Sequence, residues 1–169
     1  MENKENKLSP RRQELFEKKS SRTAASYLRR LKDIKGMTDG MLPFFDSLSR
    51  VHVSFEGVSD KPTVGTFCIM APNELIYAAG AMPVRLCSGN YAAYILGDDD
   101  VPRDACPLVK AVEGAVSAKN IPIYEDCDLF AIPITCDCKK KIAALLMKEK
   151  PTHIMHLPAM KTEDADIEQ

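Results

Sequence analysis

The chain has 169 residues, of which 45% are apolar and 28% are charged, a composition typical of a single globular domain with or without an extension. Its formal net charge of −1 argues against a globally basic nucleic-acid binder, and its longest apolar runs are too short to cross a bilayer. Met1 to Lys7 is polar and charged with no apolar segment behind it, which argues against a secretory signal and predicts a cytoplasmic protein.

Residues 1–60 are predicted to form a helical N-terminal extension. Four apolar residues follow the i, i+3, i+4, i+7 spacing of an amphipathic helix: Ala24, Tyr27, Leu28 and Leu31. We expect a serine at position 20 or 21 to cap this helix and Gly36 to end it, with a second short helix around Leu42–Leu48. The first 35 residues hold eleven Lys or Arg against five Asp or Glu. A solvated helix packed along one stripe explains this charge more simply than a nucleic-acid-binding arm.

Residues 61–160 have the pattern of an α/β domain, followed by a polar tail at 161–169. Strands are expected at 63–69, 83–86, 129–135 and 152–157, and helices at 73–80, 91–96, 106–117 and 139–149. Strands that alternate with helices predict right-handed βαβ units, and therefore a parallel sheet with flanking helices. Pro133 argues against a central place for the third strand, because proline lacks the N–H that a central strand donates.

The six cysteines, at positions 68, 87, 106, 127, 136 and 138, form no C-x-x-C pair, so the zinc-ribbon and thioredoxin patterns are absent. Cys87 and Cys136 each follow a predicted strand, at the edge where open α/β sheets bind ligands. Cys106 begins a predicted helix, whose free N–H groups favour a thiolate. Cys106 and Cys136 are therefore predicted soft-metal ligands for zinc, copper(I) or iron–sulfur. Cys68, placed inside the first strand, is interpreted as a small apolar residue.

Other polar residues point less clearly to chemistry. The run Lys139–Lys141 at a predicted helix start opposes the helix dipole, a small cost that hints at function. His153 and His156 have an odd spacing that places them on opposite faces of a strand, which argues against a shared metal. No phosphate-binding loop, dinucleotide fingerprint or serine-hydrolase elbow is present in the sequence.

Three segments in order resemble the 2-hydroxyacyl-CoA dehydratase D-component family, which includes benzoyl-CoA reductase subunits and double-cubane cluster proteins. The segments are Gly65–Cys87, Val101–Lys110 and Thr135–Lys141, and Pro151–Pro158 resembles the strand that follows. The resemblance covers about residues 60 to 160.

The resemblance implies Rossmann-like domains and a [4Fe–4S] cluster, for which Cys106 and Cys136 match two ligand positions. Cys87 is similar to a cysteine of the double-cubane branch, which implies a double-cubane iron–sulfur cluster as the alternative cofactor. The implied function is reductively initiated, radical-type dehydration of a 2-hydroxyacyl-CoA, a hydro-lyase reaction of anaerobic metabolism. The implied partners are an ATP-dependent activator, a second dehydratase subunit or a second copy of the chain, and an acyl-CoA substrate, with no nucleic acid and no membrane.

The chain also departs from the family. Family subunits are about twice as long, and the last cysteine here is Cys138, so the distal cluster ligand expected from a second domain is absent from this sequence. We therefore expect a subunit or fragment that becomes an enzyme when a second domain or a partner completes it. Two alternatives remain: a double-cubane-like, low-potential electron-transfer module, and an inactive truncated scaffold without a cluster.

Overall fold

A computed structural model of the chain describes residues 10–157 except positions 55, 57–59, 88, 99 and 120. The predicted tail at 161–169 lies outside the described residues. In chain order the elements are α1 (Pro10–Lys32), the 3-10 helix η1 (Asp39–Met41), α2 (Leu42–His52), β1 (Thr63–Thr66), α3 (Asn73–Ala78), β2 (Met82–Arg85), α4 (Tyr91–Gly97), α5 (Pro107–Ala118), α6 (Pro122–Glu125), β3 (Leu129–Pro133), α7 (Asp137–Leu146) and β4 (Thr152–Met155).

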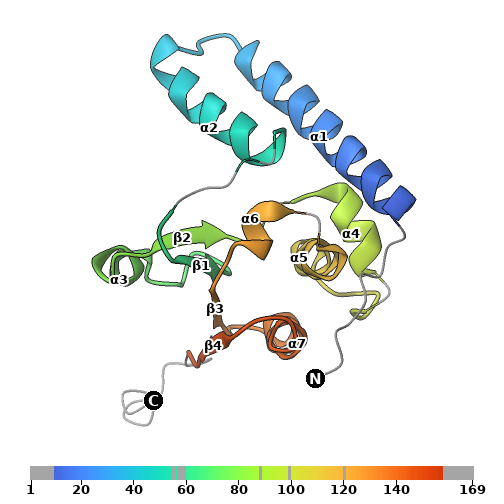
Figure 1. Cartoon of the computed structure of the whole chain (residues 1–169), viewed down its shortest axis with the longest axis vertical. Coiled ribbons are helices and arrows are strands. Elements are labelled where there is room, and N and C mark those ends of the chain that lie inside the picture. Colours follow the sequence, from blue (N-terminus) through green and yellow to red (C-terminus); the bar gives the residue numbers. More distant parts are fainter. Residues whose placement is uncertain are drawn as a thin grey trace.

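The four strands form one parallel sheet in the order β2-β1-β3-β4. Helix α3 lies on one side of the sheet, and α4, α5 and α7 lie on the other (Figure 1). The chain first steps from β1 outward to β2 and then returns past β1 to β3, so the direction of strand addition reverses between β1 and β3. The predicted α/β, Rossmann-like parallel sheet with flanking helices is confirmed.

The core lies between β3 and the helices on its side of the sheet. Phe130 and Ile132 of β3 are fully buried, as are Ile142 and Leu146, which are one turn apart on α7. Val112 of the largely buried helix α5 joins the same cluster. Apolar spacing of four residues on α7 and of two on β3 gives each element one face toward this cluster. The core thus holds α5 and α7 against β3 on one side of the sheet.

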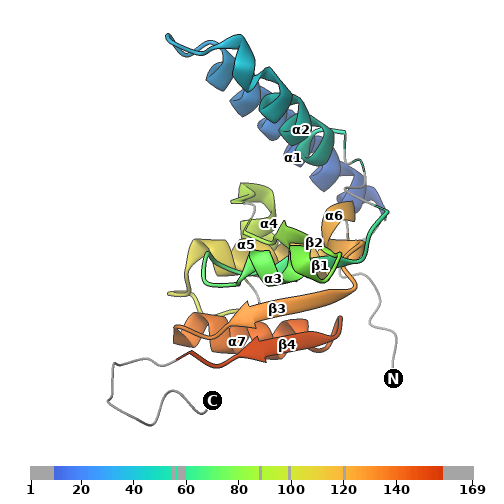
Figure 2. The ribbon, with the colours of Figure 1, turned by 90° about the vertical axis from the view of Figure 1, so that its left-hand side faces the viewer.

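The N-terminal helices α1 and α2 form an antiparallel hairpin whose turn lies far from the sheet (Figure 2). At its other end Phe16 is buried in the core cluster, and the Ser21 hydroxyl donates to the Val53 carbonyl at 3.0 Å. The predicted start at Ser20 or Ser21 was wrong, because α1 begins at Pro10 and the buried Phe16 lengthens its apolar stripe. Among the described residues, no helix has both the length and the apolar character needed to cross a membrane.

Helices α4 and α5 touch through their backbones at two glycines. A Cβ added at Gly97 would lie 1.9 Å from the Lys110 carbonyl oxygen, and one added at Gly114 would lie 1.9 Å from the Ala93 carbonyl oxygen. Both contacts are with backbone atoms, which cannot move aside as a side chain can. Close approach of the two helices therefore requires glycine at both positions.

Replacing Gly114 with Ala is expected to force α4 and α5 apart and to lower the free energy of unfolding by at least about 2 kcal/mol, because overpacking a tight contact strains the backbone. Urea unfolding followed by circular dichroism measures this loss. Gly40→Ala is the matched control, since a Cβ at that position meets only the Thr38 hydroxyl at 3.8 Å. Equal stability of the two variants would contradict the predicted contact.

Candidate functional site

Three cysteines follow the carboxyl ends of three adjacent strands. Cys68 lies two residues beyond β1, Cys87 two residues beyond β2, and Cys136 three residues beyond β3. Because β1 and β3 flank the point where strand addition reverses, the crevice at their carboxyl ends is where open α/β sheets bind ligands. The fold therefore places these thiols along one edge of the sheet.

Cys68 occupies a turn rather than a strand. Strand β1 ends at Thr66, and Cys68 has a φ of 72°, in the left-handed region that few residues other than glycine adopt. The expectation that Cys68 lies inside the strand was wrong. Partial burial alone raises the pKa of its thiol, but a hydrogen bond to the Lys139 ammonium and the backbone N–H groups of Met70 and Ile69 bring that pKa below its ordinary value.

Cys87, one of the three predicted ligands, lies just after β2 and next to Cys68. Burial raises the pKa of the Cys87 thiol, and a hydrogen bond with the Cys68 backbone partly opposes this effect. The positive charges of Arg85 and Lys139 also lower the pKa of the Cys87 thiol. Cys68, Cys87 and Lys139 thus form one group of interacting side chains, which we call the thiol–lysine cluster.

Cys106 and Cys136, the other two predicted ligands, are exposed and stand at the N-caps of α5 and α7. Ala105, directly before Cys106, and Asp137, directly after Cys136, line the same pocket of about 320 Å³, as does the half-buried Cys138. The segments that carry the two predicted ligands therefore border one cavity.

A second pocket, of about 400 Å³, connects the third predicted ligand to this region. It is lined by Gly89, two residues beyond Cys87, and by Pro107, the first residue of α5 after Cys106. The segment around Cys106 thus borders cavities on both sides, one toward α7 and one toward the segment after Cys87.

A buried lysine supports each of the two helix starts. Lys110, 1% exposed, donates to Asp98 Oδ1 at 2.5 Å and to the Arg103 carbonyl at 2.7 Å, so it holds the segment before Cys106. Lys139, 9% exposed, donates to Thr135 Oγ1 at 2.5 Å, directly before Cys136. Both ammonium groups oppose the dipole of their own helix, so their positions are explained by these contacts rather than by helix stability.

The remaining candidates do not join this edge as ligands. Cys127 is buried, and burial raises the pKa of its thiol to about 12, which suits a core residue. His153 and His156 are exposed on and just after β4. Within the part of the chain that the structure describes, no group of three or more His, Cys, Asp and Glu side chains is gathered as a metal site.

Sequence reasoning missed two of these features. The lysine run gave a signal for Lys139, through its cost at a helix N-terminus, but nothing indicated that its ammonium contacts Cys68, 71 positions earlier in the chain. Lys110 gave no signal, because a single lysine in a helix is usually exposed.

The thiol of Cys68 is expected to be the fastest of the half-buried thiols to react with iodoacetamide at pH 7 in chelator-treated protein. A lowered pKa increases the fraction of thiolate, which is the nucleophile. Lys139→Met removes the ammonium, so the pKa rises and alkylation at pH 7 slows, whereas Lys140→Met, which changes an exposed neighbour, leaves the rate unchanged. Peptide mass spectrometry across pH measures each thiol. Unchanged kinetics in Lys139→Met would contradict the assignment.

Lys110→Met is expected to free the segment before Cys106. Loss of the hydrogen bonds to Asp98 and Arg103 lowers the free energy of unfolding by about 1–3 kcal/mol. Hydrogen–deuterium exchange of residues 100–105 should quicken, while exchange in β3 stays slow. Exchange rates at 100–105 that match the parent protein would show that Lys110 does not hold this segment.

Comparison with known proteins tests the family resemblance directly. The chain is similar to the protein named "Putative dehydratase subunit YjiM" from Escherichia coli (strain K12), with 38% identity over 104 residues. That match covers 62% of this chain but only 27% of the relative's length. Residues 68–169 match the family described as 2-hydroxyglutaryl-CoA dehydratase, D-component. Since this match covers more than half of the sequence, the chain belongs to the 2-hydroxyglutaryl-CoA dehydratase D-component family.

Proposed function

We propose that the chain forms the cluster-binding first part of a 2-hydroxyacyl-CoA dehydratase-like enzyme and holds a [4Fe–4S] cluster with Cys106 and Cys136, and with Cys87 as a third ligand. The observation that carries this proposal is the cavity shared by the segments of Cys106 and Cys136, since Ala105 and Asp137 line it together. Family membership supports a dehydratase-like subunit, and the cluster and the substrate are the proposed part.

The donor chemistry of this edge fits an iron–sulfur cluster. Iron–sulfur clusters bind cysteine thiolates, and a helix N-terminus favours the thiolate form. Cys106 and Cys136 both stand at such positions, and both are exposed. The positive charge of Lys139 nearby further favours anionic sulfur along this edge.

We propose that a partner completes the site, because a [4Fe–4S] cluster takes four cysteine ligands and Cys87, Cys106 and Cys136 would supply three. In the part of the chain that the structure describes, these three cysteines are not gathered into one group of ligands. The match to the relative covers 27% of that protein's length. Exposed apolar side chains flank the cysteines: Ile69 is 76% exposed, Met70 53% and Leu108 44%. Such side chains suit a protein-covered surface. We infer that a second dehydratase subunit, or a second copy of this chain, covers this edge and supplies the missing ligand.

In the complete enzyme the bound cluster would supply one-electron chemistry for the loss of water from a 2-hydroxyacyl-CoA, with an ATP-dependent activator as the electron source. The residues of this chain would hold the two ligand segments in position and place positive charge near them. Lys110 fixes the segment before Cys106, Lys139 fixes the segment before Cys136, and α5 and α7 hold both starts against the core.

A double-cubane-like electron-transfer module is the second candidate. The observation that favours it is the thiol–lysine cluster, in which Cys68 and Cys87 add two thiols to the same edge as Cys106 and Cys136. This candidate predicts a low-potential cluster with more iron per chain and no dehydration of any acyl-CoA. An assay with activator, ATP, partner subunit and a panel of 2-hydroxyacyl-CoA thioesters distinguishes the two.

Anaerobic reconstitution with iron and sulfide is expected to give a brown protein with bound iron and acid-labile sulfide. Cys106→Ala and Cys136→Ala should each lose most of this iron, because each removes a ligand. Cys127→Ala is the matched control, since Cys127 is a buried core residue, and its iron content should equal that of the parent.

Iron, sulfide and zinc are measured by elemental and colorimetric analysis of anaerobically purified protein. Parent-level iron in Cys106→Ala and Cys136→Ala would overturn the ligand assignment. Absence of iron from the parent, alone and with its partner subunit, would favour the inactive scaffold.

A further inference from the structure

Tyr124 of α6 contacts the backbone directly before Cys87. Its hydroxyl donates to the Leu86 carbonyl at 2.5 Å, and both side chains are buried, with 1% and 0% of their surface exposed. The two residues are 38 positions apart in the chain. Leu86 and Cys87 share a peptide bond, so this hydrogen bond acts on the backbone that carries a proposed cluster ligand.

The Leu86 carbonyl would have a different partner if the sheet continued. Strands β1 and β2 pair as far as Thr66 and Arg85, and the Leu86 N–H still donates to the Thr66 carbonyl at 3.0 Å. In a parallel ladder the next hydrogen bond would run from the Cys68 N–H to the Leu86 carbonyl. The pairing ends before that bond, and Tyr124 takes the carbonyl instead.

The Cys68 N–H has another acceptor. Cys68 has a φ of 72°, which turns its backbone out of the extended conformation of a strand. Its N–H donates to the sulfur of Cys87, and this hydrogen bond lowers the pKa of the Cys87 thiol against the raising effect of burial. A buried carbonyl and a half-buried thiol thus each have a hydrogen-bond partner where the two strands end.

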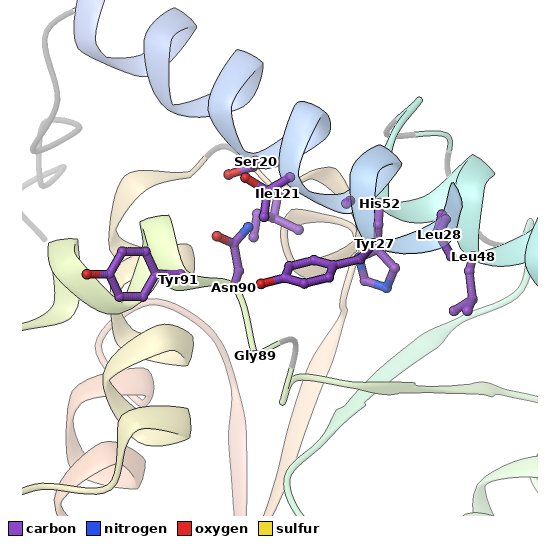
Figure 3. A pocket seen from close by; sticks show the side chains of 11 residues that line it. Ser20, Tyr27, Leu28, Leu48, His52, Gly89, Asn90, Tyr91 and Ile121 are labelled. Carbon is purple, nitrogen blue, oxygen red and sulfur yellow. The ribbon is translucent and has the colours of Figure 1, made fainter. Parts of the chain in front are cut away.

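Helix α6 has further contacts that hold the tyrosine at this carbonyl. The Lys150 ammonium donates to two backbone carbonyls at the end of this four-residue helix, that of Glu125 and, at 2.7 Å, that of Cys127. Directly before the helix, Ile121 lines the same pocket as Asn90 (Figure 3). Helix α6 is thus held next to the segment that leads into α4.

We infer that Tyr124 is a positioning residue for the thiol of Cys87. Its hydroxyl occupies the Leu86 carbonyl, so the Cys68 N–H is directed to the sulfur instead of to that carbonyl. The inference rests on the proposed function where it treats Cys87 as a cluster ligand. Hydrogen bonds to ligand sulfurs are among the factors that set the potential of an iron–sulfur cluster. In the proposed enzyme the Cys68 N–H therefore acts on a ligand sulfur.

Tyr124→Phe tests this exchange of partners, since it removes the hydroxyl and keeps the buried ring. The Leu86 carbonyl then takes the Cys68 N–H, which extends the sheet by one pair and leaves the Cys87 thiolate without that donor. The midpoint of the pH profile for alkylation of Cys87 is expected to move up by about 0.7 pH units, which corresponds to one hydrogen bond of about 1 kcal/mol. Peptide mass spectrometry of chelator-treated, full-length protein measures this profile with iodoacetamide.

A purely structural role of the tyrosine predicts a different result. Loss of stability alone would loosen the segment and speed the alkylation of Cys87 at every pH, with its midpoint unmoved. Cys138 on α7 is the reference thiol in the same protein, and its pH profile should stay unchanged. An unmoved or lowered midpoint for Cys87 in Tyr124→Phe would overturn the inference.

Tyr94→Phe is the matched control, because it removes a hydroxyl from a half-buried tyrosine and keeps the ring that faces the Lys110 ammonium. Its profile for Cys87 should equal that of the parent protein, and circular dichroism confirms that both variants are folded. The experiment uses iron-free protein throughout. Failure of the parent protein to bind iron would therefore contradict the proposed function and leave this result as it stands.

Discussion

The order of the strands decides where the chemistry of this protein lies. Because strand addition reverses between β1 and β3, no helix connects these neighbours directly, and their carboxyl ends open onto a crevice. The hydrogen bond between Lys139 and Cys68 crosses this crevice, joining the first turn of α7 to the turn after β1. Residues 71 positions apart in the chain thereby share one electrostatic environment.

The same arrangement occurs at both proposed ligands. Lys110 lies four residues after Cys106, and Lys139 lies three residues after Cys136, and each buried ammonium reaches back to the segment before its cysteine. A lysine near a helix N-terminus opposes the dipole, and burying an ammonium adds a desolvation cost. The Asp98 carboxylate offsets these costs for Lys110, and the thiol of Cys68, when ionised, offsets them for Lys139.

Much of the fold could be predicted from local patterns, and the site could not. The alternation of apolar strands and helices, the start of α5 at Pro107 and the N-cap place of Cys106 follow from residues close in sequence. Pro133 argued against a central strand, yet β3 lies between β1 and β4. Pairing with β1 stops at Ala131, so the missing N–H of Pro133 falls beyond the end of β1 and interrupts no pair. No local pattern indicated the left-handed conformation of Cys68 or its contact with Lys139, 71 positions later in the chain.

The residues just before and at the start of α4 border two pockets. Gly89, Asn90 and Tyr91 line a pocket next to the α1–α2 hairpin, which Ser20 and His52 also border, and they line the pocket that reaches Pro107, next to Cys106. Asn90 caps α4 by accepting from the N–H groups of Ala92 and Ala93, so its position is fixed by the helix rather than by a ligand. Through this short segment the N-terminal helices stand next to the edge where the cysteines lie, although α1 and the predicted ligands are distant in sequence.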